Sequence, residues 1–247
     1  MKTVLTYLSL FLILSSCKNE NKLTFEPLVL MNEACDMCPE VSIEIPKAID
    51  RTKLSETINT ALREEIISLL LFDDEIEVPS LEDALTSFKN GYLELQRLYT
   101  DESTEWEVKI DGKIVFENAS VLTIELNSYL FTGGAHGYTS KQYLNFDKNK
   151  GVELENWQLF KSKADFQHFA EAMFRLQEKI PQDKPINYTG FMFEKDSFYL
   201  PENIGFTKEG IKLRYNQYEV ASYADGTIEL TLPYKDVKKY LSTKIKS

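Results

Sequence analysis

The stretch from Trp106 to Phe131, WEVKIDGKIVFENASVLTIELNSYLF, decides the fold of this chain. Hydrophobic and polar residues alternate through most of it, which is typical of strands that bury one face. The Asp111-Gly112 dipeptide predicts a hairpin turn inside the stretch. Alternation resumes over residues 138–146, so the middle of the chain predicts an antiparallel meander with one polar face.

Helical periodicity lies on both sides of this meander. Hydrophobic residues recur at helical spacing over residues 54–70 and again over residues 81–98. Ser80 followed by Asp83 predicts the N-cap of the second helix, and Ser162 begins a third helix in the same way. Helices grouped with antiparallel strands predict an α+β fold, with antiparallel sheets and helices packed on one face.

The remaining alternation extends the sheets toward both ends of the chain. Strands are predicted over residues 41–45, 191–199, 211–215 and 228–232, and a short amphipathic helix over residues 235–241. We expect two closely packed subdomains, an N-terminal one over residues 39–131 and a C-terminal one over residues 132–247.

The N-terminus is typical of a bacterial lipoprotein. Met1 and Lys2 precede an apolar stretch too short to span a bilayer, and Leu14-Ser15-Ser16-Cys17 closes it. We expect a signal peptide over residues 1–16, acyl chains on Cys17 and a tether over residues 17–38. An ordinary secretory signal with a chance cysteine is the alternative. The prediction is a protein of the bacterial cell envelope, anchored to a membrane by lipid and facing the periplasm or the cell surface.

Cys35 and Cys38 form the other cysteine pair. Their spacing fits a redox pair, half a zinc site or a small structural disulfide. The flanking residues lack the strand and helix of a thioredoxin-like unit, and His136 and His168 are the only histidines available to complete a zinc site. In an oxidising compartment we favour a local disulfide at the start of the first strand.

Composition limits the partners and the chemistry. The formal net charge of −11 disfavours nucleic acid and favours basic partners, although it also serves plain solubility. The sequence carries no Gly-x-Ser-x-Gly elbow, phosphate loop or His-Glu-x-x-His pair. We therefore expect no catalytic activity, cofactor or metal, and we expect His168 to face solvent.

A glycine-rich segment between two aromatic strands is the best candidate binding site. Its glycines allow positive φ and close backbone approach. A simpler interpretation is a tight connection between strands, stabilised by a hydrogen bond to the histidine. The candidate residues are Tyr129, Phe131, Thr132, Gly133, Gly134, His136 and Tyr138.

Two separated motifs carry a family resemblance. Thr132-Gly133-Gly134-Ala135-His136-Gly137, the later segment Tyr218–Gly226 (YEVASYADG) and Leu232-Pro233-Tyr234 together resemble the extracytoplasmic module of RsiV-type anti-sigma factors. The same module precedes the catalytic domain of PdaC-type peptidoglycan deacetylases. The resemblance covers residues 39–241 and implies a ligand-binding module, because RsiV-type modules bind lysozyme. The transmembrane and sigma-binding segments of one family and the deacetylase domain of the other have no counterpart here, so neither output is expected.

These observations predict a non-catalytic envelope lipoprotein that binds a protein or glycan ligand. A lysozyme-like basic protein and peptidoglycan are the expected partners, beside the membrane reached through the lipid. The alternatives are an enzyme that modifies cell-wall polysaccharide through His136, or a structural lipoprotein that assembles envelope complexes.

Overall fold

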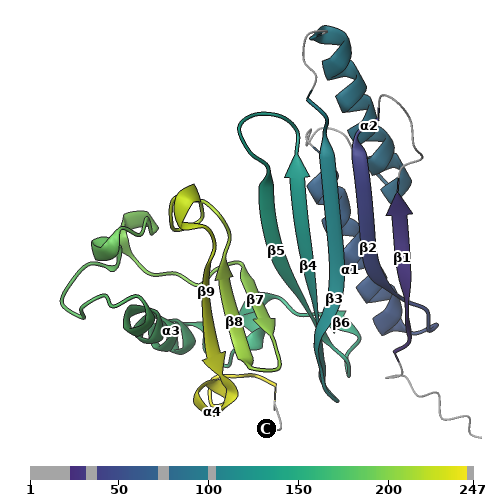
Figure 1. Ribbon diagram of the computed structural model, residues 1–247. Coiled ribbons are helices and arrows are strands. Elements are labelled where there is room, and N and C mark those ends of the chain that lie inside the picture. Colours follow the sequence, from purple (N-terminus) through teal and green to yellow (C-terminus); the bar gives the residue numbers. More distant parts are fainter. Residues whose placement is uncertain (1–22, 32–37, 72–77, 100–103, 244–247) are drawn as a thin grey trace, which may run out of the picture.

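The computed structural model describes residues 23–31, 38–71, 78–99 and 104–243. Its strands form a six-stranded sheet and a three-stranded sheet, which lie side by side (Figure 1). This arrangement confirms the α+β class. The elements, in chain order, are β1 (Phe25–Met31), β2 (Glu40–Ala48), α1 (Lys53–Leu70), α2 (Leu81–Leu98), β3 (Glu107–Glu117), β4 (Val121–Phe131), β5 (Tyr138–Asp147), β6 (Val152–Glu153), η1 (Asn156–Leu159), α3 (Lys163–Gln177), η2 (Ile186–Thr189), η3 (Glu194–Asp196), β7 (Asn203–Phe206), β8 (Gly210–Tyr215), η4 (Tyr223–Asp225), β9 (Ile228–Pro233) and α4 (Tyr234–Val237).

The larger sheet has the strand order β1-β2-β3-β4-β5-β6, and α1 and α2 cover one of its faces (Figure 1). The alternating hydrophobic residues of β2, β3 and β4 point toward these helices and are buried with them in one core. The predicted caps are present, because the Ser80 hydroxyl accepts from the Asp83 backbone N at 3.1 Å and Ser162 does the same for Asp165 at 3.2 Å. The opposite face of the sheet, which carries the polar residues, is available for contacts with other parts of the molecule.

One pair in this sheet is parallel. β2 pairs with β3 in parallel, whereas every other neighbouring pair is antiparallel. Parallel strands need a long crossover, and α1 and α2 supply it. The meander predicted for the middle of the chain is therefore present, with a parallel neighbour on one side.

The hairpin predicted at Asp111-Gly112 is wrong. Both residues lie inside β3, where Gly112 pairs with Leu126 of β4. A Cβ on Gly112 would lie 3.0 Å from Cδ of Pro46, so the glycine permits close packing against β2 rather than a turn.

The true hairpin turn follows β3. The side-chain oxygen of Asn118 accepts from the backbone N of Ser120 at 2.7 Å and of Val121 at 2.8 Å. This is the local hydrogen bonding by which Asn favours turns. The turn therefore depends on one side chain rather than on a glycine.

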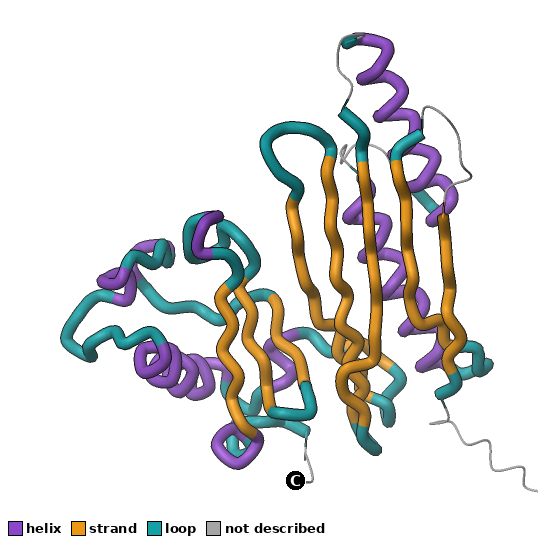
Figure 2. The backbone as a smooth tube through the Cα atoms, in the orientation of Figure 1, coloured by secondary structure: helices purple, strands orange, loops and turns teal. Residues whose placement is uncertain are grey.

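The smaller sheet, β7-β8-β9, packs with α3 in a second core (Figures 1 and 2). The two sheets meet along β5 and β7. The Phe116 and Phe206 rings stack with their centroids 5.7 Å apart, and the Asn145 amide donates to Ile204 O at 2.7 Å. The two subdomains therefore pack closely, with aromatic and hydrogen-bonded contacts between them.

The change of subdomain comes later than the predicted boundary between residues 131 and 132. β5 and β6 extend the larger sheet, and Leu144 and Phe146 of β5 belong to the first core. The second core takes its residues mainly from Leu159 onward. The glycine-rich segment is a connection within the first subdomain, because an aromatic strand follows it and pairs with β4.

Other local predictions also differ from the structure. Residues 25–31, placed in the tether, form β1 and pair with β2, which continues through Pro46 to Ala48. Residues 191–199 contain η3 instead of strands, and the helix predicted over 235–241 is limited to α4. Cys17 and Cys35 lie outside the described residues. Cys38 is disulfide-bonded, and its pairing with Cys35 stays a prediction.

Candidate ligand-binding surface

The glycine-rich segment is the connection between β4 and β5. Gly133 and Gly134 have φ values of 108° and 89°, which side chains other than glycine rarely adopt. Gly137 lies against the Tyr129 ring, since a Cβ there would be 2.4 Å from Cε2 of the tyrosine. The glycines thus have two roles. Gly133 and Gly134 let the chain reverse direction, and Gly137 lets the Tyr129 ring pack onto the backbone.

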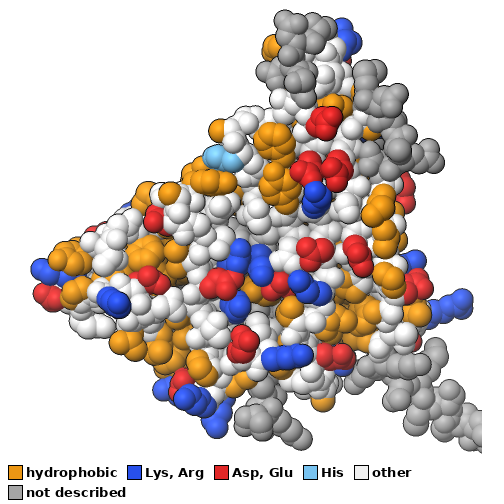
Figure 3. Space-filling view, viewed as in Figure 1, with side chains coloured by type: hydrophobic (Ala, Val, Ile, Leu, Met, Phe, Trp, Pro, Cys, Tyr) orange, Lys and Arg blue, Asp and Glu red, His pale blue; other side chains and the backbone are white. Residues whose placement is uncertain are grey.

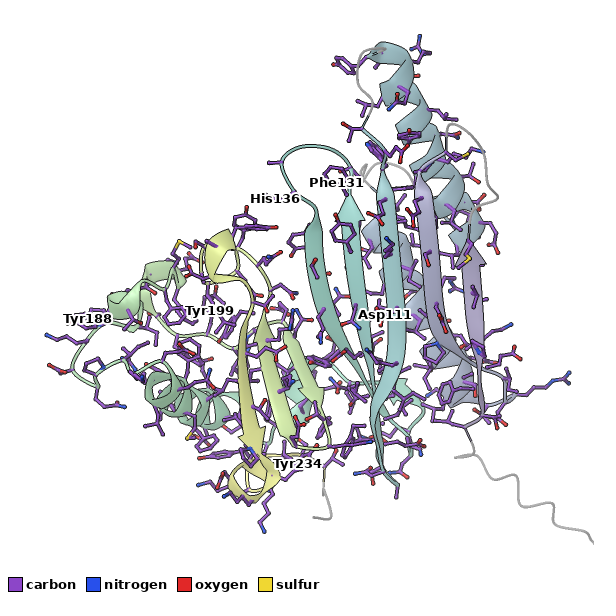
Figure 4. The ribbon with its side chains drawn as sticks, viewed as in Figure 1. Asp111, Phe131, His136, Tyr188, Tyr199 and Tyr234 are labelled. Carbon is purple, nitrogen blue, oxygen red and sulfur yellow. The ribbon has the colours of Figure 1, made fainter. Side chains whose placement is uncertain are left out.

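The His136 side chain of this connection reaches the second subdomain. Its ring stacks on Tyr223 of η4 with centroids 3.9 Å apart and planes 17° apart. Figure 4 shows His136 at the side of the β4–β5 connection that faces the smaller sheet. The contact joins the two motifs that carry the family resemblance, although they are far apart in sequence. The hydrogen bond considered for this histidine is replaced by an aromatic stack.

A tight turn precedes η4 and presents a second tyrosine. The Glu219 backbone N donates to Asn216 O at 3.2 Å, and the Asn216 backbone N donates to Oε2 of Glu219 at 2.8 Å. Tyr218 lies between them with φ 67°, and its ring is 5.4 Å from that of Tyr223. A turn with positive φ at its third residue normally carries Gly or Asn there. Tyrosine is kept at that position at a conformational cost.

Asn216 fastens this turn to the larger sheet. Its side-chain oxygen accepts from the Lys141 backbone N at 3.1 Å, and its amide donates to Lys141 O at 3.2 Å. The same oxygen accepts from Nε of Arg214 at 3.2 Å. At the edge of β5, the Asn216 side chain thus forms the backbone hydrogen bonds that a neighbouring strand would otherwise form. These bonds hold the turn beside the glycine-rich connection.

These parts form a surface that we call the loop face. Figure 3 shows hydrophobic side chains on either side of the histidine on the viewed face. Tyr218 is 58 % exposed and Tyr138 is 42 % exposed, so both rings are available to a partner. The loop face comprises Tyr129, Phe131, Thr132, Gly133, Gly134, His136, Tyr138, Tyr218 and Tyr223.

A half-buried carboxyl lies at the edge of the loop face. Burial, together with the charge of Glu202, raises the pKa of Glu219 above its usual range, although the Asn216 N–H partly opposes this. Burial and the charge of Glu219 raise the pKa of Tyr138. The Tyr199 hydroxyl donates to Glu219 O at 3.1 Å. The Tyr199 bond is to the backbone of Glu219, whereas the carboxyl itself accepts from the Asn216 backbone N.

Ion pairs fill the junction between the sheets beneath this face. Lys141 lies 3.1 Å from Glu125 on the larger sheet, and Lys212 lies 3.3 Å from Glu229 on the smaller one. Burial raises the pKa of Glu229, but its contacts with Arg214 and Lys212 lower it by more, so the net shift is downward. These charges satisfy one another across neighbouring strands.

Within the described residues, the structure contains no group of three or more His, Cys, Asp or Glu side chains placed to hold a metal ion. His168 is exposed on α3, as predicted. Among the helices in the described ranges, none combines the length and the hydrophobicity of a membrane span.

A separate cavity opens away from the loop face. It has a volume of about 340 Å³ and lies between β1, β2 and the helices, with Leu28, Ile45 and Leu62 in its wall. Its wall is mainly hydrophobic, although Lys47, Arg63 and Glu82 also line it.

Sequence reasoning identified the glycine-rich half of the loop face and missed its partners. All seven candidate residues lie on or beside the β4–β5 connection. Tyr218, Tyr223, Asn216 and Glu219 were not singled out, because nothing local to them indicates a site. The signal that could have found them was the second motif of the resemblance, which contains three of the four.

Two family models match separate parts of the chain. Residues 33–139 match the family model described as "Deacetylase PdaC", and residues 157–235 match "Protein of unknown function (DUF3298)". The chain is also 29 % identical over 120 residues to the peptidoglycan-N-acetylmuramic acid deacetylase PdaC of Bacillus subtilis (strain 168). These matches support a PdaC-like and DUF3298-like module. The match to the Bacillus enzyme covers 47 % of this chain and 25 % of that protein.

Solved structures share the fold of the module. A DUF3298 family protein from Pseudomonas aeruginosa PAO1 gives a TM-score of 0.63 at 21 % identity, covering 90 % of this chain and 96 % of that one. A DUF3298 family member from Bacteroides fragilis NCTC 9343 gives 0.66 at 21 % identity, covering 92 % and 96 %. The boundary between the matched regions falls in the part of the chain that contains β5 and β6. The likeness to RsiV-type proteins and the lipid anchor stay predictions.

Proposed function

We propose that this module is a non-catalytic component of the bacterial cell envelope that binds a protein or glycan ligand on the loop face. The observation that carries the proposal is the contact between His136 and Tyr223, which joins two subdomains and leaves tyrosine rings exposed beside it. Exposed apolar patches of this kind mark interaction sites. The PdaC-like match connects the module to the cell wall, since the relative is named as a peptidoglycan deacetylase.

Cys17 is the proposed lipid anchor that holds the module at a membrane. Among protein ligands, a basic protein such as lysozyme is the first to test, because the chain has a formal net charge of −11. Opposite charges speed encounter and favour association. Charge alone also gives non-specific binding, which salt screens over about 10 Å at 0.1 M.

The test is a calorimetric titration of the full chain, purified in detergent, with lysozyme and with soluble cell-wall glycan fragments at low and moderate salt. One-to-one binding that survives moderate salt supports the proposal. Binding that disappears with salt is simple charge attraction. The variant His136→Ala should weaken specific binding, whereas the control His168→Ala, an exposed histidine on α3, should not. Turnover of a glycan that His136→Ala abolishes would instead favour the enzyme alternative.

A further inference from the structure

The cavity between β1, β2 and the two long helices has the size and the lining of a small-molecule site. Its volume of about 340 Å³ lies in the range of ligand pockets, and Leu28, Ile45 and Leu62 belong to its wall. An apolar cavity of about 150 Å³ takes up benzene, so this one holds roughly a dozen carbon atoms. Figure 1 shows β1 and β2 at the edge of the larger sheet that lies away from the smaller sheet, so the cavity is separate from the loop face.

The wall of the cavity is built from residues of the first core. Ile45 and Leu62 are buried in that core, and Leu81 joins them from the start of α2. Leu28 of β1 is half-buried and packs against the same core. These contacts hold the wall in place, so an apolar group that enters the cavity displaces water without rearranging the fold.

Two cations lie on one side of the cavity. The Asn59 side chain of α1 accepts from the Ala48 backbone N at 2.9 Å and donates to Ala48 O at 2.8 Å. Lys47 precedes Ala48, and Arg63 lies one helical turn after Asn59, so both cations belong to this side. Lys47 has an exposed ion pair of 3.7 Å with Glu26. Arg63 forms no ion pair or side-chain hydrogen bond with any residue that the structure describes.

One carboxylate opposes these cations. Among the described residues that line the cavity, Glu82 alone is acidic, and it belongs to the first turn of α2 rather than to β2 or α1. The positive end of the helix dipole stabilises an acidic side chain at that position. The lining therefore carries two cations against one carboxylate, and the Arg63 guanidinium has its donors available.

We infer that this cavity binds an anionic amphiphile, a carboxylate with one apolar chain of about ten carbon atoms. The carboxylate pairs with Arg63 at the mouth, where a guanidinium offers two parallel hydrogen bonds, and the chain lies against Leu28, Ile45 and Leu62. The head group stays at the solvent side, so little of its hydration is lost. The inference goes beyond the proposed function and does not depend on the ligand of the loop face.

The test uses decanoate with a photoreactive diazirine at the end of its chain, added to the full chain in nanodiscs of neutral phosphatidylcholine. After irradiation and proteolysis, mass spectrometry locates the label. Unlabelled decanoate and decanol serve as competitors, at one fixed lipid concentration because both partition into the bilayer.

Three variants separate the parts of the site. Arg63→Gln removes the charge at the mouth, and Leu28→Trp fills the cavity from β1. The matched control is Arg51→Gln, because Arg51 is an exposed arginine that does not line the cavity. Thermal unfolding of each variant checks that the fold is kept.

We expect the label on peptides that contain Leu28, Ile45 or Leu62, and decanoate should compete about tenfold better than decanol after correction for partitioning. Arg63→Gln should need about tenfold more probe for half-maximal labelling, Leu28→Trp should abolish the labelling, and Arg51→Gln should match the wild type. Labelling elsewhere in the chain would overturn the inference. Equal competition by decanol, or wild-type labelling of Arg63→Gln, would also overturn it, because the cavity would then not select an anion.

Discussion

Replacing Asn216 is the strongest single test of the hydrogen bonds that attach the Asn216–Glu219 turn of the loop face to β5. Replacement by Ala removes three hydrogen bonds, two to the backbone of Lys141 and one from Arg214. The Lys141 N–H and C=O then lose their partners in a partly buried position. Each such bond contributes about 1 kcal/mol net, and an unsatisfied buried group costs about 1–3 kcal/mol. We expect Asn216→Ala to lower the free energy of unfolding by about 2–3 kcal/mol.

Equilibrium unfolding in urea measures this loss, with the slope of the transition checked for constancy. The control is Asn127→Ala, which removes one exposed bond to Asp111 of 2.8 Å and should cost about 0.5 kcal/mol or less. Hydrogen exchange at the Lys141 amide supplies a local readout, and exchange should accelerate in Asn216→Ala. The reasoning fails if the two variants lose equal stability, or if the Lys141 amide exchanges at its wild-type rate.

Three further changes test other parts of the structure. Glu219→Gln keeps an acceptor for Asn216 and removes a carboxyl whose pKa burial raises, so ionisation of the wild-type group opposes folding. The variant should have the higher thermal midpoint at pH 7, and this difference in midpoint should vanish as the pH falls below 4.5, the ordinary pKa of the carboxyl. A difference that stays the same across that pH range would contradict a raised pKa for Glu219. Gly205→Ala would place a Cβ 2.4 Å from the buried Tyr143 ring and should cost about 1–3 kcal/mol in denaturant unfolding, so a neutral effect would mean that the sheets can separate there. Ser80→Ala removes the N-cap of α2 and should cost about 1 kcal/mol, seen as a lower urea midpoint at constant slope.

Sequence patterns predicted the helices and strands that depend on residues close together in the chain. The periodicity of α1 and α2 and the alternation of β8 and β9 depend on residues a few positions apart, and the structure confirms these elements. The Ser80 and Ser162 caps were predicted correctly because each depends on one local hydrogen bond, from the backbone N three residues later to the serine hydroxyl. Fold class followed from these elements.

Predictions failed where a distant partner overrides local preference. Gly112 has turn chemistry with Asp111, but Pro46 approaches it from β2 and a strand results. β1 has no clear alternation in its sequence, because its exposed positions Val29 and Met31 are hydrophobic, and pairing with β2 holds it. The boundary after Phe131 was misplaced for the same reason, since β5 is needed to complete the larger sheet.

Part of the candidate site could be predicted from local sequence and part could not. The glycines near His136 could be recognised in the sequence because positive φ and close backbone approach restrict the residue type. Tyr223 was invisible as a partner, since stacking across subdomains leaves no fixed spacing in the sequence. Only the joint occurrence of the two motifs linked them, and that link came from resemblance rather than from residue physics.

The loop face is a property of the packed pair of subdomains. Its glycine-rich connection belongs to the larger sheet, whereas Tyr218 and Tyr223 follow the smaller sheet's β8. Contacts between these halves include the His136–Tyr223 stack, the Phe116–Phe206 stack, the Asn145 bond to Ile204 and the Asn216 bonds to Lys141. The proposed ligand would contact both halves, so its binding would be linked to subdomain docking and would stabilise the interface. A change that loosens the interface should therefore weaken binding even when it lies far from the ligand.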